Sequence, residues 1–281
     1  MTSEGIDATG TTPTDFEKDT AAKPLGEGRY EINLSDRWWI GRGPNGGYVA
    51  ALMLRAMTAE VDSTRSGQPL PARSLTVHFL LPPSTGPARV EVTIEHAGHV
   101  TAFLSARLVQ DGEVKAKAMS VFSGEREGPA FNQSKMPDAP APDDLEEMDT
   151  EQAPVAVFGR YRAKFIEGFP GEARERAETM GWIRLRDEQA VDPVLAAAVL
   201  DVWYPAPFVV FKKPPFAPTL EYTVHFPRTI PGPCPPDWNL IRLTAEESAE
   251  GHFSEDAELW SRDGKLLAKA RQMALLRHRK G

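Results

Sequence analysis

The sequence has little cysteine and no long apolar run. Cys234 is the single cysteine among 281 residues, so neither an internal disulfide nor a cysteine-based zinc cluster can form. No stretch of about 18 uncharged apolar residues occurs, which argues against a membrane-spanning helix. Residues 1–24 are polar and acidic, unlike a secretory signal. Together these absences predict a cytoplasmic protein.

Signatures of several catalytic classes are also missing. The chain has no Gly-x-Ser-x-Gly elbow, no glycine-rich phosphate loop ending in Gly-Lys-Ser/Thr, and no His-Glu-x-x-His. His96 and His99 have a chelating spacing but flank an expected turn, so we expect no metal site. With 32 Lys and Arg against 40 Asp and Glu, the net charge is −8, which argues against nucleic-acid binding.

Shifts in composition divide the chain. We expect residues 1–24 to be a flexible tail and residues 124–154 to be a linker, because the latter combine five prolines with an acidic run. The linker separates an N-terminal folded half, residues 25–123, from a C-terminal one, residues 155–281. Each half is long enough to form its own domain.

The two halves resemble each other. Three short motifs occur in the same order in both: Thr-Val-His-Phe at 76–79 and 223–226, Asp-Gly at 111–112 and 263–264, and Ala-Lys-Ala at 116–118 and 268–270. This order indicates an internal duplication. The alternative is two unrelated antiparallel sheets that share the same hairpin chemistry.

Each half contains one apolar helix followed by a meander of strands. One helix is expected from Gly46, and the other from Val194 to about Tyr204, after the N-cap and proline of Asp192-Pro193. Alternating patterns predict strands at 89–96, 101–109 and 114–122, and again at 240–247, 251–261 and 266–276. A helix that is apolar nearly all round must be buried. We therefore predict an α+β double hotdog, with two antiparallel sheets that each wrap a central helix.

Three polar residues lie in apolar surroundings of the second half. Asp201 is the one charged residue of the predicted helix, and a buried carboxylate needs hydrogen bonds or water. Thr219 begins a strand, where a structural role is common. Gln272 has the same strand parity as a row of alanines, which predicts a partly buried amide in need of partners. The plain alternative for Asp201 is an acid at a helix end that reaches solvent.

These segments resemble type II acyl-CoA thioesterases and their thioesterase-like relatives. The resemblance rests on the start of the first helix at 43–50, the helix that ends in Asp201, the strand from Thr219, and the last strand with Gln272. It implies a double hotdog fold and hydrolysis of the thioester of acyl-CoA. In that family an Asp, a Ser or Thr, and a Gln position and activate a water, and by position these roles fall to Asp201, Thr219 and Gln272.

The internal repeat supports a catalytic role for this trio. Alignment of the repeated motifs places Ala72 opposite Thr219 and Ser120 opposite Gln272. The first helix has no carboxylate before Glu60. A structural role would more naturally occur in both copies, so the asymmetry favours catalysis.

The start of the first helix is a candidate oxyanion site. Asn45, Gly46, Gly47 and Tyr48 offer backbone amides at the positive end of the helix dipole. The alternative for the two glycines is close backbone packing. We expect the acyl chain to lie in an apolar tunnel, for which Met53, Met57, Trp203 and Phe208 are the candidate lining residues.

The resulting hypothesis is an acyl-CoA thioesterase that needs no cofactor and binds acyl-CoA as its substrate. One alternative is a non-catalytic double hotdog that binds acyl-CoA or lipid. Another is an enoyl-CoA hydratase, which would require a histidine beside Asp201. Exposed sheet edges are compatible with a homodimer or a higher homo-oligomer.

Overall fold

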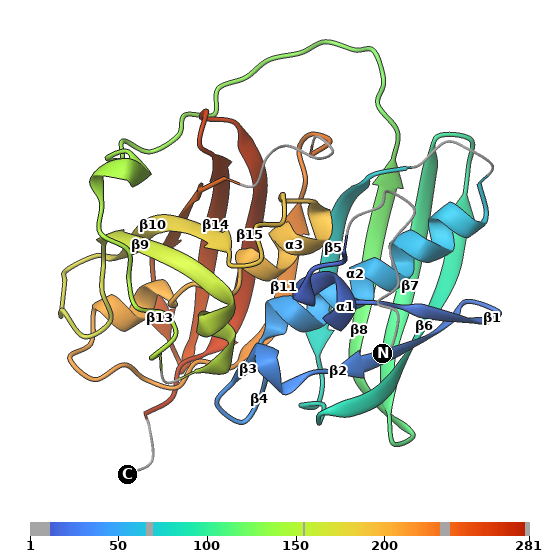
Figure 1. Cartoon of the computed structure of the whole chain (residues 1–281), viewed down its shortest axis with the longest axis horizontal. Coiled ribbons are helices and arrows are strands. Elements are labelled where there is room, and N and C mark those ends of the chain that lie inside the picture. Colours follow the sequence, from blue (N-terminus) through green and yellow to red (C-terminus); the bar gives the residue numbers. More distant parts are fainter. Residues whose placement is uncertain (1–11, 66–69, 154, 231–236, 279–281) are drawn as a thin grey trace.

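The computed structural model describes residues 12–65, 70–153, 155–230 and 237–278, and most of them lie in antiparallel strands (Figure 1). The α-helices are α1 (Asp15–Asp19), α2 (Gly46–Ser63) and α3 (Pro193–Val199). The strands of the N-terminal half are β1 (Lys23–Gly26), β2 (Arg29–Leu34), β3 (Trp39–Ile40), β4 (Gly43–Pro44), β5 (Ala72–Phe79), β6 (Gly86–Ala97), β7 (Thr101–Gln110) and β8 (Glu113–Ser123). Those of the C-terminal half are β9 (Tyr161–Glu167), β10 (Ala177–Leu185), β11 (Thr219–His225), β12 (Asn239–Ala245), β13 (Ser248–Ala249), β14 (His252–Ser261) and β15 (Leu266–Leu275).

One continuous sheet joins the two halves, where two separate sheets were predicted. Its strand order is β1-β2-β6-β7-β8-β5-β11-β15-β14-β12-β10-β9, with β13 paired to β14. The junction is the antiparallel pair β5–β11, at the centre of the molecule (Figure 1). The prediction of two sheets was therefore wrong, because the exposed edge of each half pairs with the other half of the same chain. Within each half, the predicted strands are confirmed.

The junction reveals a pseudo-two-fold axis. Thr76 lies opposite Thr223 in the β5–β11 register, and their Oγ1 atoms are 2.9 Å apart. These two threonines are the equivalent positions of the repeated motif, separated by 147 residues (223 − 76). The N-caps of α2 and α3, Asn45 and Asp192, have the same separation (192 − 45). The duplication indicated by the sequence is thus a structural one, with equivalent residues facing each other across the centre.

The two buried helices pack against each other. Helix α2 also contacts β5, β6, β7 and β8, and its first eight residues after Gly46 are buried. Helix α3 ends at Val199, so the prediction of a helix to Tyr204 was too long. The chain tightens there, with the Asp201 N–H donating to the Ala198 carbonyl at 3.4 Å, and Pro205 then restricts the residue before it. Asp201 therefore lies in the turn after α3 and not inside the helix.

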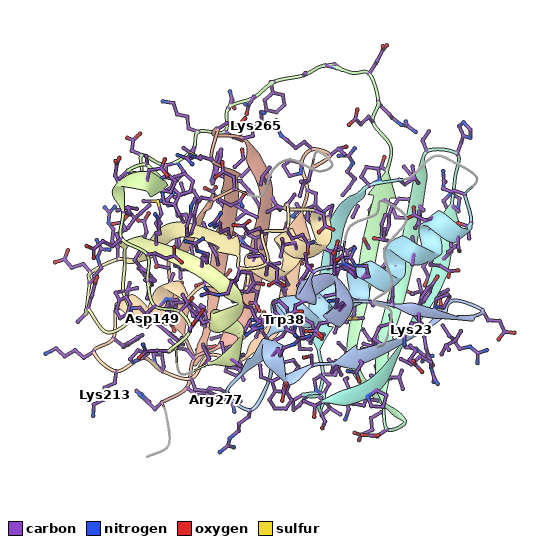
Figure 2. The ribbon with its side chains drawn as sticks, viewed as in Figure 1. Lys23, Trp38, Asp149, Lys213, Lys265 and Arg277 are labelled. Carbon is purple, nitrogen blue, oxygen red and sulfur yellow. The ribbon has the colours of Figure 1, made fainter. Side chains whose placement is uncertain are left out.

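The predicted N-terminal tail is ordered from residue 12 onward, contrary to expectation. Phe16 of α1 is fully buried and packs edge-on against Trp38, with 5.2 Å between ring centroids. The Trp38 indole N–H donates to Asp19 at 2.7 Å, and Trp38 also contacts Tyr161 of the other half. Figure 2 shows Trp38 near the middle of the molecule. The packing of Phe16 on Trp38 thus holds in place a segment whose composition is typical of a flexible tail. Residues 1–11 lie outside the described part of the chain.

The linker has its own structural role. Residues 124–141 form no helix or strand and cross between the halves as one long connection (Figure 1). Towards its C-terminal end, Ala139 and then Leu145 pack against a small second core of the C-terminal half that includes Trp182 and Trp260. Among the described residues, no helix has the length and apolar character needed to cross a membrane.

Candidate active site

Asp201 is held by the start of α2. Its Oδ2 accepts the backbone N–H of Gly47 at 2.7 Å and the Nδ2 group of Asn45 at 3.0 Å. The same Asn45 Nδ2 donates to the Asp201 carbonyl at 2.9 Å. The other carboxylate oxygen, Oδ1, receives no hydrogen bond from the described residues. The carboxylate is therefore fixed through one oxygen, and the second is left as an acceptor.

Burial tunes the acidity of Asp201. Loss of hydration raises the pKa of its carboxyl to about 7, although the hydrogen bonds from Gly47 and Asn45 act in the opposite direction. A carboxyl with a pKa near neutrality is matched to proton transfer at physiological pH. Asp201 as a whole is half-buried, so the alternative of an acid at a helix end that reaches solvent is met in part.

The two glycines at the start of α2 allow the close approach. A Cβ on Gly47 would lie 2.7 Å from the Ala198 carbonyl oxygen and 2.9 Å from the Cβ of Asp201. A Cβ on Gly46 would lie 3.0 Å from Asp201 Oδ2 and 3.1 Å from the Phe79 ring. The packing alternative for both glycines is thus what the structure shows, and it also brings the Gly47 N–H to the carboxylate.

Tyr48 faces away from Asp201. Its hydroxyl donates to the Asp19 carbonyl at 2.8 Å, and its ring stacks on Trp38. Its backbone N–H donates to the capping Oδ1 of Asn45 at 3.2 Å. The amide of Gly47 is likewise engaged by Asp201. Of the four residues predicted for the oxyanion site, Gly46 alone keeps a backbone N–H that no hydrogen bond among the described residues occupies.

Thr219 and Gln272 are brought together by an irregularity in β11. In a regular strand, side chains alternate between the two faces of the sheet, so Thr219 would point to the opposite face from Tyr222. Gln272 on β15 is paired with Tyr222 and lies on the same face as Tyr222. A register shift between Thr219 and Glu221 interrupts this alternation and turns Thr219 to the face of Gln272. The Thr219 hydroxyl donates a hydrogen bond to Gln272 Oε1 at 2.7 Å. Such β-bulges re-aim single side chains. The same shift occurs in β5 between Ala72 and Ser74, where the re-aimed residue is alanine.

Glu255 extends this pair, and the sequence analysis missed it. On β14 it lies opposite Gln272, and its Oε1 accepts the Gln272 Nε2 group at 2.6 Å. Its Oε2 accepts the backbone N–H of Ala206. Burial raises the pKa of Glu255 to about 8, against the effect of these two bonds. The signal was present in the sequence, because Glu255 shares the parity of Phe253 and other buried residues of its strand.

The predicted trio therefore forms two groups. Thr219 and Gln272 are hydrogen-bonded, whereas Asp201 bonds to Asn45 and Gly47. The groups are in electrostatic range of each other, because the negative charge of Asp201 contributes to the raised pKa of Glu255. The strand row Tyr222–Gln272–Glu255 also faces α3, since the Tyr222 hydroxyl donates to the Ala197 carbonyl at 2.8 Å.

The residues predicted to line an acyl tunnel are mostly core residues. Met53 and Met57 of α2 are fully buried in the main core. The Trp203 indole donates to Thr179 Oγ1 at 2.9 Å and stacks on Phe165. Phe208 is partly buried in the short helical turn after Asp201. Aromatic residues, beginning with Trp203, therefore follow the candidate base Asp201 closely in the chain.

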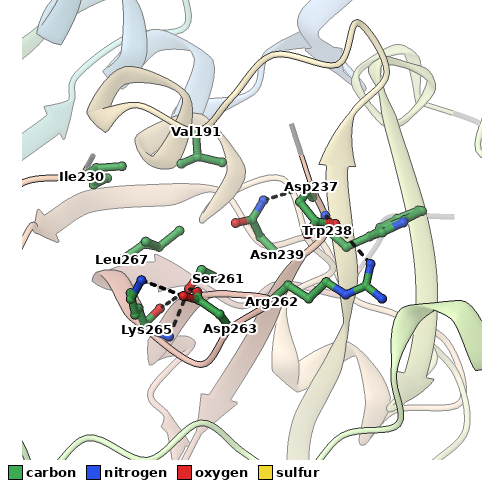
Figure 3. Close-up of a pocket in the computed structure, with 10 residues that line it drawn as sticks. All are labelled: Val191, Ile230, Asp237, Trp238, Asn239, Ser261, Arg262, Asp263, Lys265 and Leu267. Carbon is green, nitrogen blue, oxygen red and sulfur yellow. Dashed lines mark hydrogen bonds and ion pairs between the residues drawn. The ribbon is translucent and has the colours of Figure 1, made fainter. Parts of the chain in front are cut away.

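A surface pocket of the C-terminal half lies away from these residues. It has a volume of about 470 Å³ and is drawn in Figure 3; its charged lining residues are Asp237, Arg262, Asp263 and Lys265. These side chains pair with one another and with Asp143, so they present no unpaired charge to a ligand. Within the described ranges, no group of three or more His, Cys, Asp or Glu residues is placed to hold a metal ion.

Comparisons with known proteins agree with this architecture. A family model for the acyl-CoA thioesterase N-terminal domain matches residues 34–123, and one for the acyl-CoA thioesterase C-terminal domain matches residues 136–276. A hot dog fold protein of unknown function from Alicyclobacillus acidocaldarius has a TM-score of 0.84 and 26% identity, covering 95% of this chain and 100% of that one. The acyl-CoA thioesterase II TesB2 from Mycobacterium marinum has a TM-score of 0.73 and 22% identity, with 95% and 99% coverage.

A curated relative matches a shorter stretch. The thioesterase-like protein TwmA from Talaromyces wortmannii is 37% identical over 99 residues, which are 34% of this chain. The match spans 27% of the length of TwmA. The similarity to TwmA is therefore local.

Proposed function

The chain belongs to the acyl-CoA thioesterase family, and from this membership and the site geometry we propose that it hydrolyses acyl-CoA to a carboxylic acid and coenzyme A. The observation that carries the proposal is the half-buried Asp201 carboxylate, held through Oδ2 with Oδ1 open and with its pKa raised by loss of hydration to about 7. A thioester is an activated acyl group, so hydrolysis requires a positioned water and stabilisation of the developing charge.

The water would lie between the two polar groups of the site. Thr219 donates its hydroxyl proton to Gln272, which leaves the lone pairs of Oγ1 free. The water would donate one hydrogen bond to Thr219 Oγ1 and the other to Asp201 Oδ1, so that an oxygen lone pair points to the acyl carbon. Asp201 takes the proton as the carbon–oxygen bond forms. The carbon–sulfur bond then breaks, and the proton is returned to the coenzyme A thiolate.

Gly46 is the proposed oxyanion donor. Its N–H is the free amide at the positive end of the α2 dipole, and its Cα lies close enough to Asp201 that an added Cβ would be 3.0 Å from Oδ2. A carbonyl oxygen bound there would place the acyl carbon beside the water held by Asp201. The acyl chain would then extend towards the aromatic side chains that follow in sequence, beginning with Trp203.

Release of free thiol from short-, medium- and long-chain acyl-CoAs tests the proposal. The Asp201→Asn variant is expected to lower kcat by at least about 100-fold, the scale of general-base catalysis, with an unchanged melting temperature. Asp192→Asn is the matched control, because asparagine caps a helix as well as aspartate does, and Asp192 is the N-cap of α3 whereas Asp201 follows its C-terminal end. Tight binding of acyl-CoA without thiol release by the wild type would instead identify a non-catalytic binding protein.

A further inference from the structure

Glu255 is a buried carboxylate that the proposed reaction does not use. Glu255 is 1% exposed, yet no cation among the described residues pairs with it: both oxygens accept bonds from neutral N–H groups, on Gln272 and on Ala206. An ionised carboxylate in such a position is costly. The two bonds connect separate segments, since Gln272 belongs to the last strand and Ala206 lies five residues beyond Asp201.

The chemistry of these bonds sets a direction along the network. Above its pKa of about 8, Glu255 is an ionised carboxylate that can only accept hydrogen bonds, so Gln272 then presents Nε2 to Glu255 and Oε1 to Thr219. Thr219 has one hydroxyl proton and gives it to that Oε1. Its oxygen is consequently an acceptor for a further group. Without an obligate acceptor at position 255, the side-chain amide of Gln272 could rotate by 180° and present Nε2 to Thr219. The Thr219 hydroxyl would then accept a hydrogen bond from Gln272 and could donate its proton elsewhere.

The pseudo-two-fold symmetry separates this role from the requirements of the fold. In the N-terminal half, Leu104 lies opposite Ser120 as Glu255 lies opposite Gln272. Leu104 is fully buried, so the fold accommodates leucine at this position. The entire polar row is replaced there: Ala72, Ser120 and Leu104 stand where the other half has Thr219, Gln272 and Glu255. The carboxylate thus occurs only in the half that contains Asp201.

We propose that Glu255 is a positioning residue of the hydrolytic site, which fixes the amide of Gln272 and so makes Thr219 accept a hydrogen bond from the attacking water. It also ties the turn after Asp201 to the same strand row through the Ala206 N–H. The inference rests on the proposed thioesterase function and assigns an additional residue to it.

Kinetics of Glu255→Gln and Glu255→Leu test this role. Glutamine offers one acceptor oxygen in place of two, so it cannot accept from both Ala206 and Gln272. Thiol release is measured at pH 9, where the Glu255 carboxyl is ionised. Both variants are expected to lower kcat by about 100-fold, the scale of a small misplacement of reacting groups, with KM unchanged. Ser120→Ala, in the equivalent row of the other half, is the control and should retain kcat.

A double-mutant cycle distinguishes positioning from a general loss of stability. Because Glu255 acts through Gln272, adding Glu255→Gln to Gln272→Ala should lower kcat no further. Additive losses, or a folded Glu255→Gln variant with wild-type kcat, would overturn the positioning role while leaving the hydrolase intact. Absence of thiol release from the wild type would instead overturn the hydrolase and the positioning role together. If Glu255→Leu has no cooperative melting transition, Glu255→Gln alone decides.

Discussion

Substitution of Gly47 by alanine tests the close contact between α2 and the Asp201 turn. The added Cβ would meet the Ala198 oxygen at 2.7 Å, the Ala197 oxygen at 2.9 Å and the Asp201 Cβ at 2.9 Å. The two oxygens belong to the backbone of α3 and cannot rotate away. We estimate a cost of about 3 kcal/mol for this overpacking, offset by about 1 kcal/mol from the better helix propensity of alanine. The net loss is about 2 kcal/mol, or roughly 4 °C in melting temperature for a chain of this size.

The same substitution should also impair hydrolysis. Separation of the helices would lengthen the bond from the Gly47 N–H to Asp201 Oδ2 and shift the carboxylate, with a loss in kcat of roughly 10- to 100-fold. Gly124→Ala is the matched control, because its nearest contact would be an ordinary 3.5 Å to the Leu70 side chain. Differential scanning calorimetry and the thiol-release assay measure both effects. A Gly47→Ala variant with the stability and kcat of Gly124→Ala would refute the close contact.

Two further predictions concern the buried carboxyl groups. Asn45→Ala removes a hydrogen bond that lowers the pKa of Asp201, so the acid limb of the pH–rate profile should move above pH 7, and an unmoved limb would disprove this electrostatic role. The substitution also removes the N-cap of α2, which should lower the free energy of unfolding in urea by about 1 kcal/mol. Glu255 has a folded pKa of about 8 against a reference value of 4.5, so the folded state keeps a proton that the unfolded state has released. Its contribution to stability is present below pH 4.5 and is lost as pH rises to 8, at up to about 1.4 kcal/mol per pH unit. The wild type should lose stability relative to Glu255→Gln across this range, and parallel curves would contradict the burial effect.

Local patterns were sufficient to predict the main elements. The glycine pair after Asn45 marks the start of α2, and the Asp-Gly hairpin is formed as expected, with positive φ at Asp111 and Gly112. Alternation predicted the meanders, because one face of each strand is buried. Polar residues in apolar segments indicated Asp201 and Gln272 by the same reasoning.

What the sequence could not predict depends on contacts between distant segments. The fusion of the two sheets through β5 and β11 requires knowledge of which edge pairs with which. The docking of α1 depends on one aromatic residue, Phe16, finding Trp38. The bulge that re-aims Thr219 leaves no clear signal in the residues around it. Glu255 was detectable by strand parity, but its partner Ala206 lies just beyond the helix predicted to end at about Tyr204, and the local pattern gives no indication that the two meet.

The pH dependence of kcat/KM for the wild type on its best acyl-CoA tests the central claim most directly, because Asp201 must be ionised to accept a proton from water. The burial that raises its pKa to about 7 predicts that kcat/KM rises about tenfold per pH unit below pH 7 and less steeply above it. A profile that is flat from pH 5 to 8, or that falls only near pH 4, would show that this buried carboxylate is not the base.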